Sequence, residues 1–280
     1  MKTFFLTAFA LTAFAFNSIL CRMALATGEI DAASFTVIRL VSGTVTLAAL
    51  LLATGKTRML TTNGSWTSAF FLFTYAIAFS LAYLGLTTGT GALTLFGSVQ
   101  LTMFGVSLYR GVRPGTLEWI GLIVAFAGLI FLVFPGLTAP PLLSAVLMSA
   151  AGIAWGFYTL RGKGSEDPLA DTAGNFLRSL PLMIVAAAAY FSSMQISIRG
   201  AVLAILSGSV ASGIGYSVWY AALKHHTATR AAVLQLSVPI IAAIGGLVLL
   251  AETASARLLL AGILILGGIG MTLMHRGERR

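Results

Sequence analysis

Charged residues are scarce in this chain, and their scarcity excludes most classes of protein. Only 9% of the 280 residues are charged, 58% are hydrophobic, and the mean hydropathy is +0.96. Soluble domains carry about 25% charged residues, so lipid must be the solvent for most of this chain. At about 20 residues per crossing, ten spans would use most of the length and leave only short loops. The sequence therefore predicts an all-α integral membrane protein.

Cysteine and membrane-buried acids and histidines are also lacking. Cys21 is the only cysteine, which excludes an internal disulfide and a cysteine metal cluster. The acidic residues and histidines fall in predicted loops or near span ends: Glu29, Asp31, Glu118, Glu166, Asp167, Asp171, Glu252, Glu278, His225, His226 and His275. A proton relay or an intramembrane active site needs such groups within the bilayer. We expect no enzyme activity, metal or cofactor, and a facilitator or exchanger is at least as well supported as a proton antiporter.

The sequence contains an internal repeat, whose two copies are offset by 139 positions. Segment 16–22 matches 155–161, Arg39 matches Arg178, and Ser98-Val99 matches Ser237-Val238. If each copy holds five spans, the odd number places the copies in opposite orientations, as in many secondary transporters. The pattern predicts two inverted five-helix repeats, at residues 1–137 and 138–280.

The spacing of apolar runs predicts ten spans. They lie near 3–25, 32–54, 65–87, 90–110, 115–134, 141–161, 171–191, 199–223, 228–250 and 255–275. Basic residues then gather in every second loop and in the C-terminal tail, and the intervening loops contain only Arg199 and Arg257. The positive-inside rule places both termini in the cytoplasm. This rule also accounts for the net charge of +9, so we expect no nucleic-acid partner.

The N-terminal segment from Lys2 to Phe16 has the form of a cleavable signal peptide. Its counterpart, at 142–161, lies in the interior of the chain, where signal peptidase would not remove it. We therefore expect the segment to be retained as the first span.

Residues 232–239 (Ala-Val-Leu-Gln-Leu-Ser-Val-Pro) lead to Glu252 and then to Gly262 and Gly268. This run resembles the end of a repeat in bacterial EamA-type transporters of the drug/metabolite transporter superfamily, and the resemblance covers nearly the whole chain. It implies a ten-helix carrier in the bacterial inner membrane, commonly an exporter of amino acids or other small metabolites. It also implies a central cavity lined by the first, third, fourth, sixth, eighth and ninth helices.

The first copy departs from the family pattern at two places. Gln100 stands where the second copy has Pro239, and Arg113 stands near the place of Glu252. Any role attached to that proline or glutamate therefore applies to one half only.

Arg39 and Arg178 are predicted to lie within the second and seventh spans. A charged side chain costs at least about 2.5 kcal/mol near the bilayer centre, so each must have a partner or a role. One interpretation is a pair of sites that bind an anionic substrate group on its way in and out. The other, which we favour, is a structural arginine bound to carbonyls at a helix end.

Three amides, Asn17, Gln100 and Gln235, are predicted near the midplane. Each must bridge helices or face a cavity, because an amide in lipid needs a partner. Pro239 predicts a kink that frees a carbonyl one turn earlier.

Aromatic residues form a second set of candidates for an organic pocket. They are Tyr75, Trp155, Tyr158, Tyr216 and Trp219. Tyr83 and Tyr220 lie nearer the predicted span ends and are interpreted as members of the interfacial aromatic belt.

The sequence favours a secondary transporter, an exporter or exchanger, that moves an amino acid or related small metabolite by alternating access. The alternative is a carrier of a larger metabolite or a vitamin- or nucleotide-type anion that uses Arg39 and Arg178. A membrane-embedded enzyme and a non-transporting receptor are less well supported. The expected partners are a small-molecule substrate and the lipid bilayer, and the small-residue faces of the fifth and tenth spans leave a homodimer open.

Overall fold

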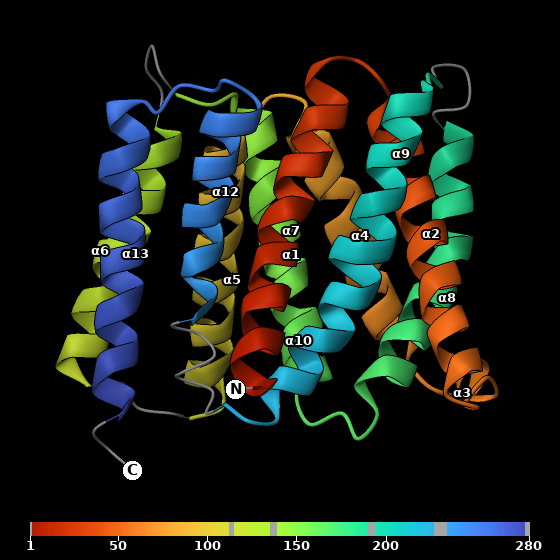
Figure 1. Ribbon diagram of the computed structural model, residues 1–280. Helices are drawn as coiled ribbons and strands as arrows, with labels where there is room; N and C mark the ends of the chain where they lie inside the picture. The colour runs from red at the N-terminus through yellow and green to blue at the C-terminus, as the bar shows by residue number, and fades with distance from the viewer. Residues whose placement is uncertain (1, 112–114, 135–138, 190–193, 227–233, 278–280) are drawn as a thin grey trace.

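The protein is a bundle of helices that run between two ends (Figure 1). The computed structural model describes residues 2–111, 115–134, 139–189, 194–226 and 234–277. Before residue 135 the helices are α1 (Lys2–Ala26), α2 (Ala32–Ala53), the short α3 (Met59–Thr62), α4 (Trp66–Ala82), α5 (Thr88–Tyr109) and α6 (Thr116–Val133). After residue 138 they are α7 (Leu142–Gly162), α8 (Pro168–Ala189), α9 (Ile198–Leu206), the π-helix η2 (Ser207–Ile214), α10 (Gly215–Leu223), α12 (Ser237–Leu249) and α13 (Ala256–Gly277).

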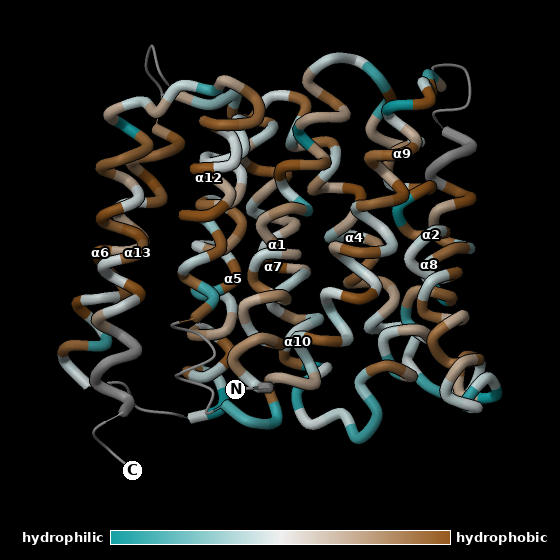
Figure 2. Tube along the Cα trace, viewed as in Figure 1, coloured by the Kyte–Doolittle hydropathy of each residue, from teal (hydrophilic) through white to brown (hydrophobic). Residues whose placement is uncertain are grey.

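The helices have the length and composition of membrane spans. Six stretches are long and apolar enough to cross a membrane, and three further apolar helices are shorter. Figure 2 shows hydrophobic residues along the helices and hydrophilic residues gathered at the two ends of the bundle. The predicted all-α membrane fold is confirmed, and the described part of the chain contains no strand. The count of ten crossings and the inverted relation of residues 1–137 to 138–280 remain predictions.

Most described helix ends lie within a few residues of the predicted ones. The largest difference is at α4, which ends at Ala82 instead of residue 87, because Tyr83 caps the helix and the chain turns at Gly85. The apolar sequence continues through this turn, so hydropathy alone does not mark it. The predicted span at 228–250 is described as helix α12 from Ser237, and residues 227–233 lie outside the described residues.

Side-chain caps fix where several helices begin. Asp31 accepts a hydrogen bond from the Ser34 amide at the start of α2, and Thr87 accepts one from Thr90 at the start of α5. Such caps satisfy backbone N–H groups that have no partner inside the helix. They explain why short polar residues mark these boundaries in an otherwise apolar sequence.

The eighth predicted span is not a uniform α-helix. Its centre is the π-helix η2, whose sequence, SGSVASGI, consists mainly of small residues. Gly208 lies directly against α2, where a Cβ atom would be 2.1 Å from the Arg39 carbonyl oxygen. The two helices can therefore approach closely only because the residue at 208 is glycine.

Charge divides the two ends of the bundle. We call the end where α1 begins and α13 ends the basic end; it carries Lys56, Lys163 and Lys224 in its loops (Figure 1). The opposite end carries the loops at 27–31, 83–87, 194–197 and 250–255.

Candidate substrate cavity

Arg39 of α2 is the centre of a buried hydrogen-bond network. Its side chain is 1% exposed. Nε donates to Ser212 Oγ at 3.0 Å, and Nη2 donates to the hydroxyls of Tyr75 at 3.1 Å and Tyr216 at 2.9 Å. The guanidinium carbon also lies 5.1 Å from the centroid of the Tyr75 ring and 5.2 Å from that of Phe79. Hydroxyls and aromatic faces thus stabilise this cation, without a carboxylate among its described partners.

Asn17 of α1 extends the same network. Its amide nitrogen donates to the Tyr75 hydroxyl at 2.9 Å, and its oxygen accepts from Ser207 Oγ at 2.6 Å. The network therefore joins α1, α2 and α4 to η2 and α10, so segments from both ends of the sequence meet at one depth. Arg39 Nη1 is buried and has no hydrogen-bond partner among the described residues.

A small cavity of about 10 Å³ lies beside this network. Aromatic rings fill most of the space: the Trp155 centroid is 4.7 Å from that of Tyr216 and 4.9 Å from that of Tyr75. This volume is no larger than one water molecule requires. The centre of the bundle is therefore packed in this conformation and has no room for a metabolite.

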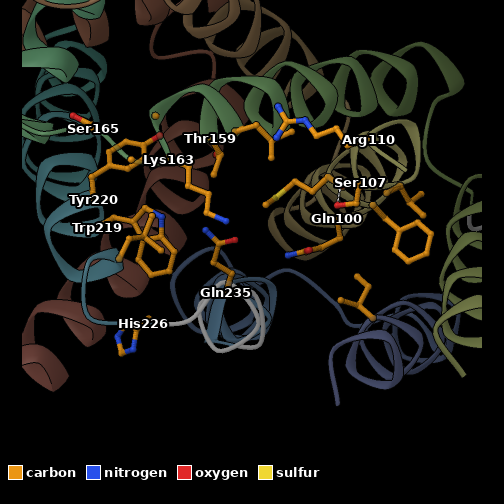
Figure 3. Close-up of a pocket in the computed structure, with 18 of the residues that line it drawn as sticks. Gln100, Ser107, Arg110, Thr159, Lys163, Ser165, Trp219, Tyr220, His226 and Gln235 are labelled. Atoms are coloured by element: carbon orange, nitrogen blue, oxygen red, sulfur yellow. Dashed lines mark hydrogen bonds between the residues drawn. The ribbon is translucent and has the colours of Figure 1, made fainter. Parts of the chain in front are cut away.

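A much larger cavity, of about 470 Å³, lies nearer the basic end, as its lining residues at the ends of α5, α7 and α10 show. Figure 3 shows most of the side chains that line it. Its walls come from α5, α6, α7, α10 and α13, from residues of the segment 163–168, and from Lys224, His226 and Gln235. Gln100, Trp219 and Gln235 line it, together with the cations Arg110, Lys163 and Lys224. The volume falls in the range of about 300 to 1,000 Å³ that small-molecule sites occupy.

Two buried donors in this cavity have no protein acceptor. Gln100 Nε2 and Trp219 Nε1 make no hydrogen bond with any described residue. A buried N–H group without a partner costs about 1–3 kcal/mol, so these groups are poised for water or a ligand. Trp219 also packs against Phe14, at 5.7 Å between ring centroids, and Phe14 in turn lines the small cavity.

The opposite end of the bundle is closed by contacts between segments far apart in the sequence. Arg22 Nε lies 3.3 Å from Glu252 Oε1, and the same carboxylate accepts from the Thr88 amide at 2.8 Å. Asp31 accepts from the Gln195 amide at 3.0 Å. Burial alone would raise the pKa of Asp31, but hydrogen bonds, chiefly from Ser34, hold it below its usual value. Glu252 thus caps the start of α5 and pairs with Arg22.

The candidate residues divide into two groups and two separate residues. The small cavity is lined by Asn17, Tyr75, Trp155 and Tyr216, and Arg39 donates to the hydroxyls of Tyr75 and Tyr216. The large cavity is lined by Gln100, Trp219 and Gln235. Tyr158 stacks on Trp155 at 5.3 Å but lines neither cavity.

Arg178 lies apart from both cavities. Its guanidinium donates to the carbonyls of Thr61 at 2.7 Å and Gly174 at 3.0 Å, and to that of Asn63. These contacts tie α8 to the segment between α3 and α4. Arg178 therefore makes the contacts expected of a structural arginine, which binds backbone carbonyls near a helix end.

Pro239 occupies the first turn of α12, directly after a break in the helix at Leu236. Proline is tolerated there because the N–H groups of a first turn have no helical acceptor. The residue therefore marks the start of α12 instead of a bend in the middle of one regular helix.

The interpretation of Tyr83 and Tyr220 as interfacial aromatics is wrong. Tyr83 is 0% exposed and Tyr220 is 6% exposed. The Tyr83 hydroxyl donates to the Thr88 carbonyl at the closed end, and Tyr220 lines the large cavity. Position near a span end indicates depth in the membrane, but it does not indicate which face of the helix a residue occupies.

Lys163 and Phe14 were not among the candidates predicted from the sequence. Lys163 was counted only as a loop charge, and its place at the end of a cavity-lining helix was the available signal. Phe14 lies in an apolar helix and is one of eighteen phenylalanines in the chain, so no sequence signal distinguishes it.

An all-helical membrane bundle with a cavity large enough for a small molecule has the architecture of a membrane transporter. The comparisons with known proteins agree. A family model described as the EamA-like transporter family matches residues 142–274. An uncharacterized protein of Pseudomonas aeruginosa is 48% identical over 275 residues, which is 98% of this chain and 96% of the relative. The chain belongs to the EamA-like transporter family, within the drug/metabolite transporter superfamily.

Two further similarities are more distant. An uncharacterized transporter of Archaeoglobus fulgidus is 29% identical over 168 residues, covering 56% of this chain and 57% of that protein. A crystal structure with 18% sequence identity has a TM-score of 0.68 and covers 98% of this chain and 99% of its own. The second likeness supports the fold alone.

Proposed function

We propose that this protein is a secondary transporter that exports or exchanges an amino acid or related small organic metabolite by alternating access. The observation that carries the proposal is the large cavity, open toward the basic end, combined with a closed opposite end. A site accessible from one end at a time is what alternating access requires. The volume of about 470 Å³ is sufficient for an amino acid with a large side chain.

The proposed orientation places the basic end in the cytoplasm of a bacterial cell, with the protein in the inner membrane. The loops and helix ends at this end hold most of the described lysines and arginines, as the positive-inside rule expects. The cavity would then load from the cytoplasm, as an exporter needs. The two halves of the chain, 1–137 and 138–280, would rock against each other between the two states.

The test is transport into proteoliposomes of purified protein. Uptake and counterflow of amino acids, nucleosides, vitamins and organic anions would be measured with and without a pH gradient. Saturable counterflow of an amino acid or related metabolite is the expected result. Absence of flux for every compound, from protein that is folded and correctly inserted, would contradict the proposal.

Gln100→Ala is expected to lower flux about three- to tenfold without reducing the amount of folded protein. The reason is that Gln100 presents an unpaired amide to the cavity, and losing one hydrogen bond to substrate costs about 1 kcal/mol or slightly more. The matched control is Gln195→Ala, which removes an exposed side-chain amide at the opposite end. Unchanged flux in Gln100→Ala for all accepted substrates would remove Gln100 from the site.

A further inference from the structure

We propose that the transported metabolite carries a carboxylate and that Lys163, beside Gln100 and Trp219, binds this group in the large cavity. The inference rests on the transport function proposed above and adds the chemical class of the substrate. This site differs from one built on Arg39 and Arg178. Two of the three guanidinium nitrogens of Arg39 already donate to hydroxyls, and Arg178 donates to backbone carbonyls outside the cavity.

The cations near the basic end are not equivalent. Lys56 pairs with Asp167 at 2.6 Å, and Lys224 donates to the Glu166 carbonyl at 3.0 Å. Lys163, at the end of α7, lines the cavity, and its ammonium makes no ion pair or hydrogen bond within the described part of the chain. The positive-inside rule explains why cations gather at this end. It does not explain why the side-chain end of Lys163 points toward Gln100 and Gln235 across the cavity (Figure 3).

Neutral donors converge on the same space. Figure 3 shows the side-chain ends of Lys163, Gln100 and Gln235 pointing toward one another across the cavity. Gln100 Nε2 and Trp219 Nε1 are buried and unpaired, and Trp219 is 1% exposed. An ammonium with neutral N–H donors around it is the arrangement that binds a carboxylate, because hydrogen bonds to an ionised acceptor are about twice as strong as neutral ones.

The rest of the lining indicates what the carboxylate is attached to. No aspartate or glutamate is among the described residues that line the cavity, so none of these residues would repel an anion or bind an ammonium group strongly. Met103, Phe104, Leu122 and Ile269 supply apolar wall. The cavity therefore fits an organic acid with an apolar body, and an amino acid with an apolar side chain is one member of this class.

Solvent limits how strongly the Lys163 ammonium attracts a substrate carboxylate. The Lys163 side chain is exposed at the cavity mouth, where water and salt screen its charge within about 8 Å at physiological ionic strength. Removing it should therefore weaken binding by a factor of about three to ten and should not abolish folding.

The test uses four probes that share one phenyl body and differ in charge. They are phenylalanine, 3-phenylpropionate, its uncharged amide, and 3-phenylpropylamine. Binding to purified protein in detergent would be followed by quenching of tryptophan fluorescence and by the shift in unfolding temperature, for the native chain, Lys163→Gln and Lys163→Arg. The matched control is Lys56→Gln, which removes a lysine that is paired and does not line the cavity.

The expected result is that both carboxylates bind at least threefold more tightly than the amide and the amine. Lys163→Gln should weaken 3-phenylpropionate three- to tenfold and leave the amide unchanged, and Lys163→Arg should restore most of the difference. Equal binding of the four probes, no saturable binding of either carboxylate, or a Lys163→Gln protein that binds 3-phenylpropionate as the native chain does, would overturn the inference. Flux of uncharged or cationic metabolites alone would overturn it while leaving transport intact, whereas loss of all flux would contradict the transport function itself.

Discussion

Arg39 and Arg178 occupy matching positions in the sequence and have different surroundings in the structure. Arg39 is enclosed by hydroxyls and rings, whereas Arg178 lies on backbone carbonyls near the basic end. The sequence could identify both as charges inside spans, because that follows from hydropathy. It could not separate them, because all their partners except Gly174 come from segments 36 to 177 positions away.

Arg39→Lys is expected to lower the stability of the folded protein by about 1.5–3 kcal/mol. The guanidinium donates in two directions, to Ser212 and to two tyrosines, and a single ammonium cannot reach both sides. The measurement is thermal unfolding in detergent. Arg58→Lys, at an exposed position on the basic end, serves as the control and should unfold like the native chain. An Arg39→Lys protein with the native unfolding temperature would show that the network is not structural.

Lys163, Tyr83 and Tyr220 show where reasoning from the sequence stops. The sequence correctly places each of them near the end of a span. It does not reveal that Tyr83 is buried or that Lys163 and Tyr220 line the large cavity. A residue at a helix end can face lipid, water or a cavity within one turn. Which of these applies depends on the rotation of the helix, and mean hydropathy carries no information about rotation.

Among the predicted spans, the eighth contains η2, a change of helix type that the sequence did not predict. The apolar and small residues of η2 continue the composition of α9 and α10, so nothing in the hydropathy marks the change from α- to π-helical hydrogen bonding. The consequence is local: the wider turn brings Ser207 and Ser212 to Asn17 and Arg39. π-Helical segments inside α-helices are frequent at functional sites.

Gly208→Ala is expected to disrupt the contact between η2 and α2. An added Cβ atom would lie 2.1 Å from the backbone carbonyl oxygen of Arg39, which cannot move without displacing α2. We expect a clear loss of monodisperse protein by size-exclusion chromatography, or a fall in stability of at least 1–3 kcal/mol. Gly105→Ala provides the control, because no atom lies within 4 Å of its added Cβ atom. If both variants behaved alike, the close approach of η2 to α2 would be refuted.

At the scale of the whole molecule, the two ends of the bundle differ in how they are closed. The opposite end is tied by Glu252 to Arg22 and Thr88, and by Asp31 to Gln195, so contacts join residues before 135 to residues after 138. The basic end has similar ties at one side, including Lys56 to Asp167, but leaves the large cavity open beside α5, α7 and α10. The resemblance to EamA-type transporters implied a central cavity, but it could not predict which end would be open.

The central claim is that the closed end of the bundle can open. This opening would make the protein a carrier, because the cavity would then be accessible from each side of the membrane in turn. Cys21 reports on this directly: it is the only cysteine of the chain, it is 0% exposed, and it precedes Arg22 in α1. The most direct test is the rate at which a membrane-impermeant maleimide labels Cys21 in the native chain and in Glu252→Gln. Asp167→Asn, which weakens a tie at the basic end, is the control. We predict labelling several-fold faster in Glu252→Gln than in the native chain or the control, and equal rates in all three proteins would contradict the account.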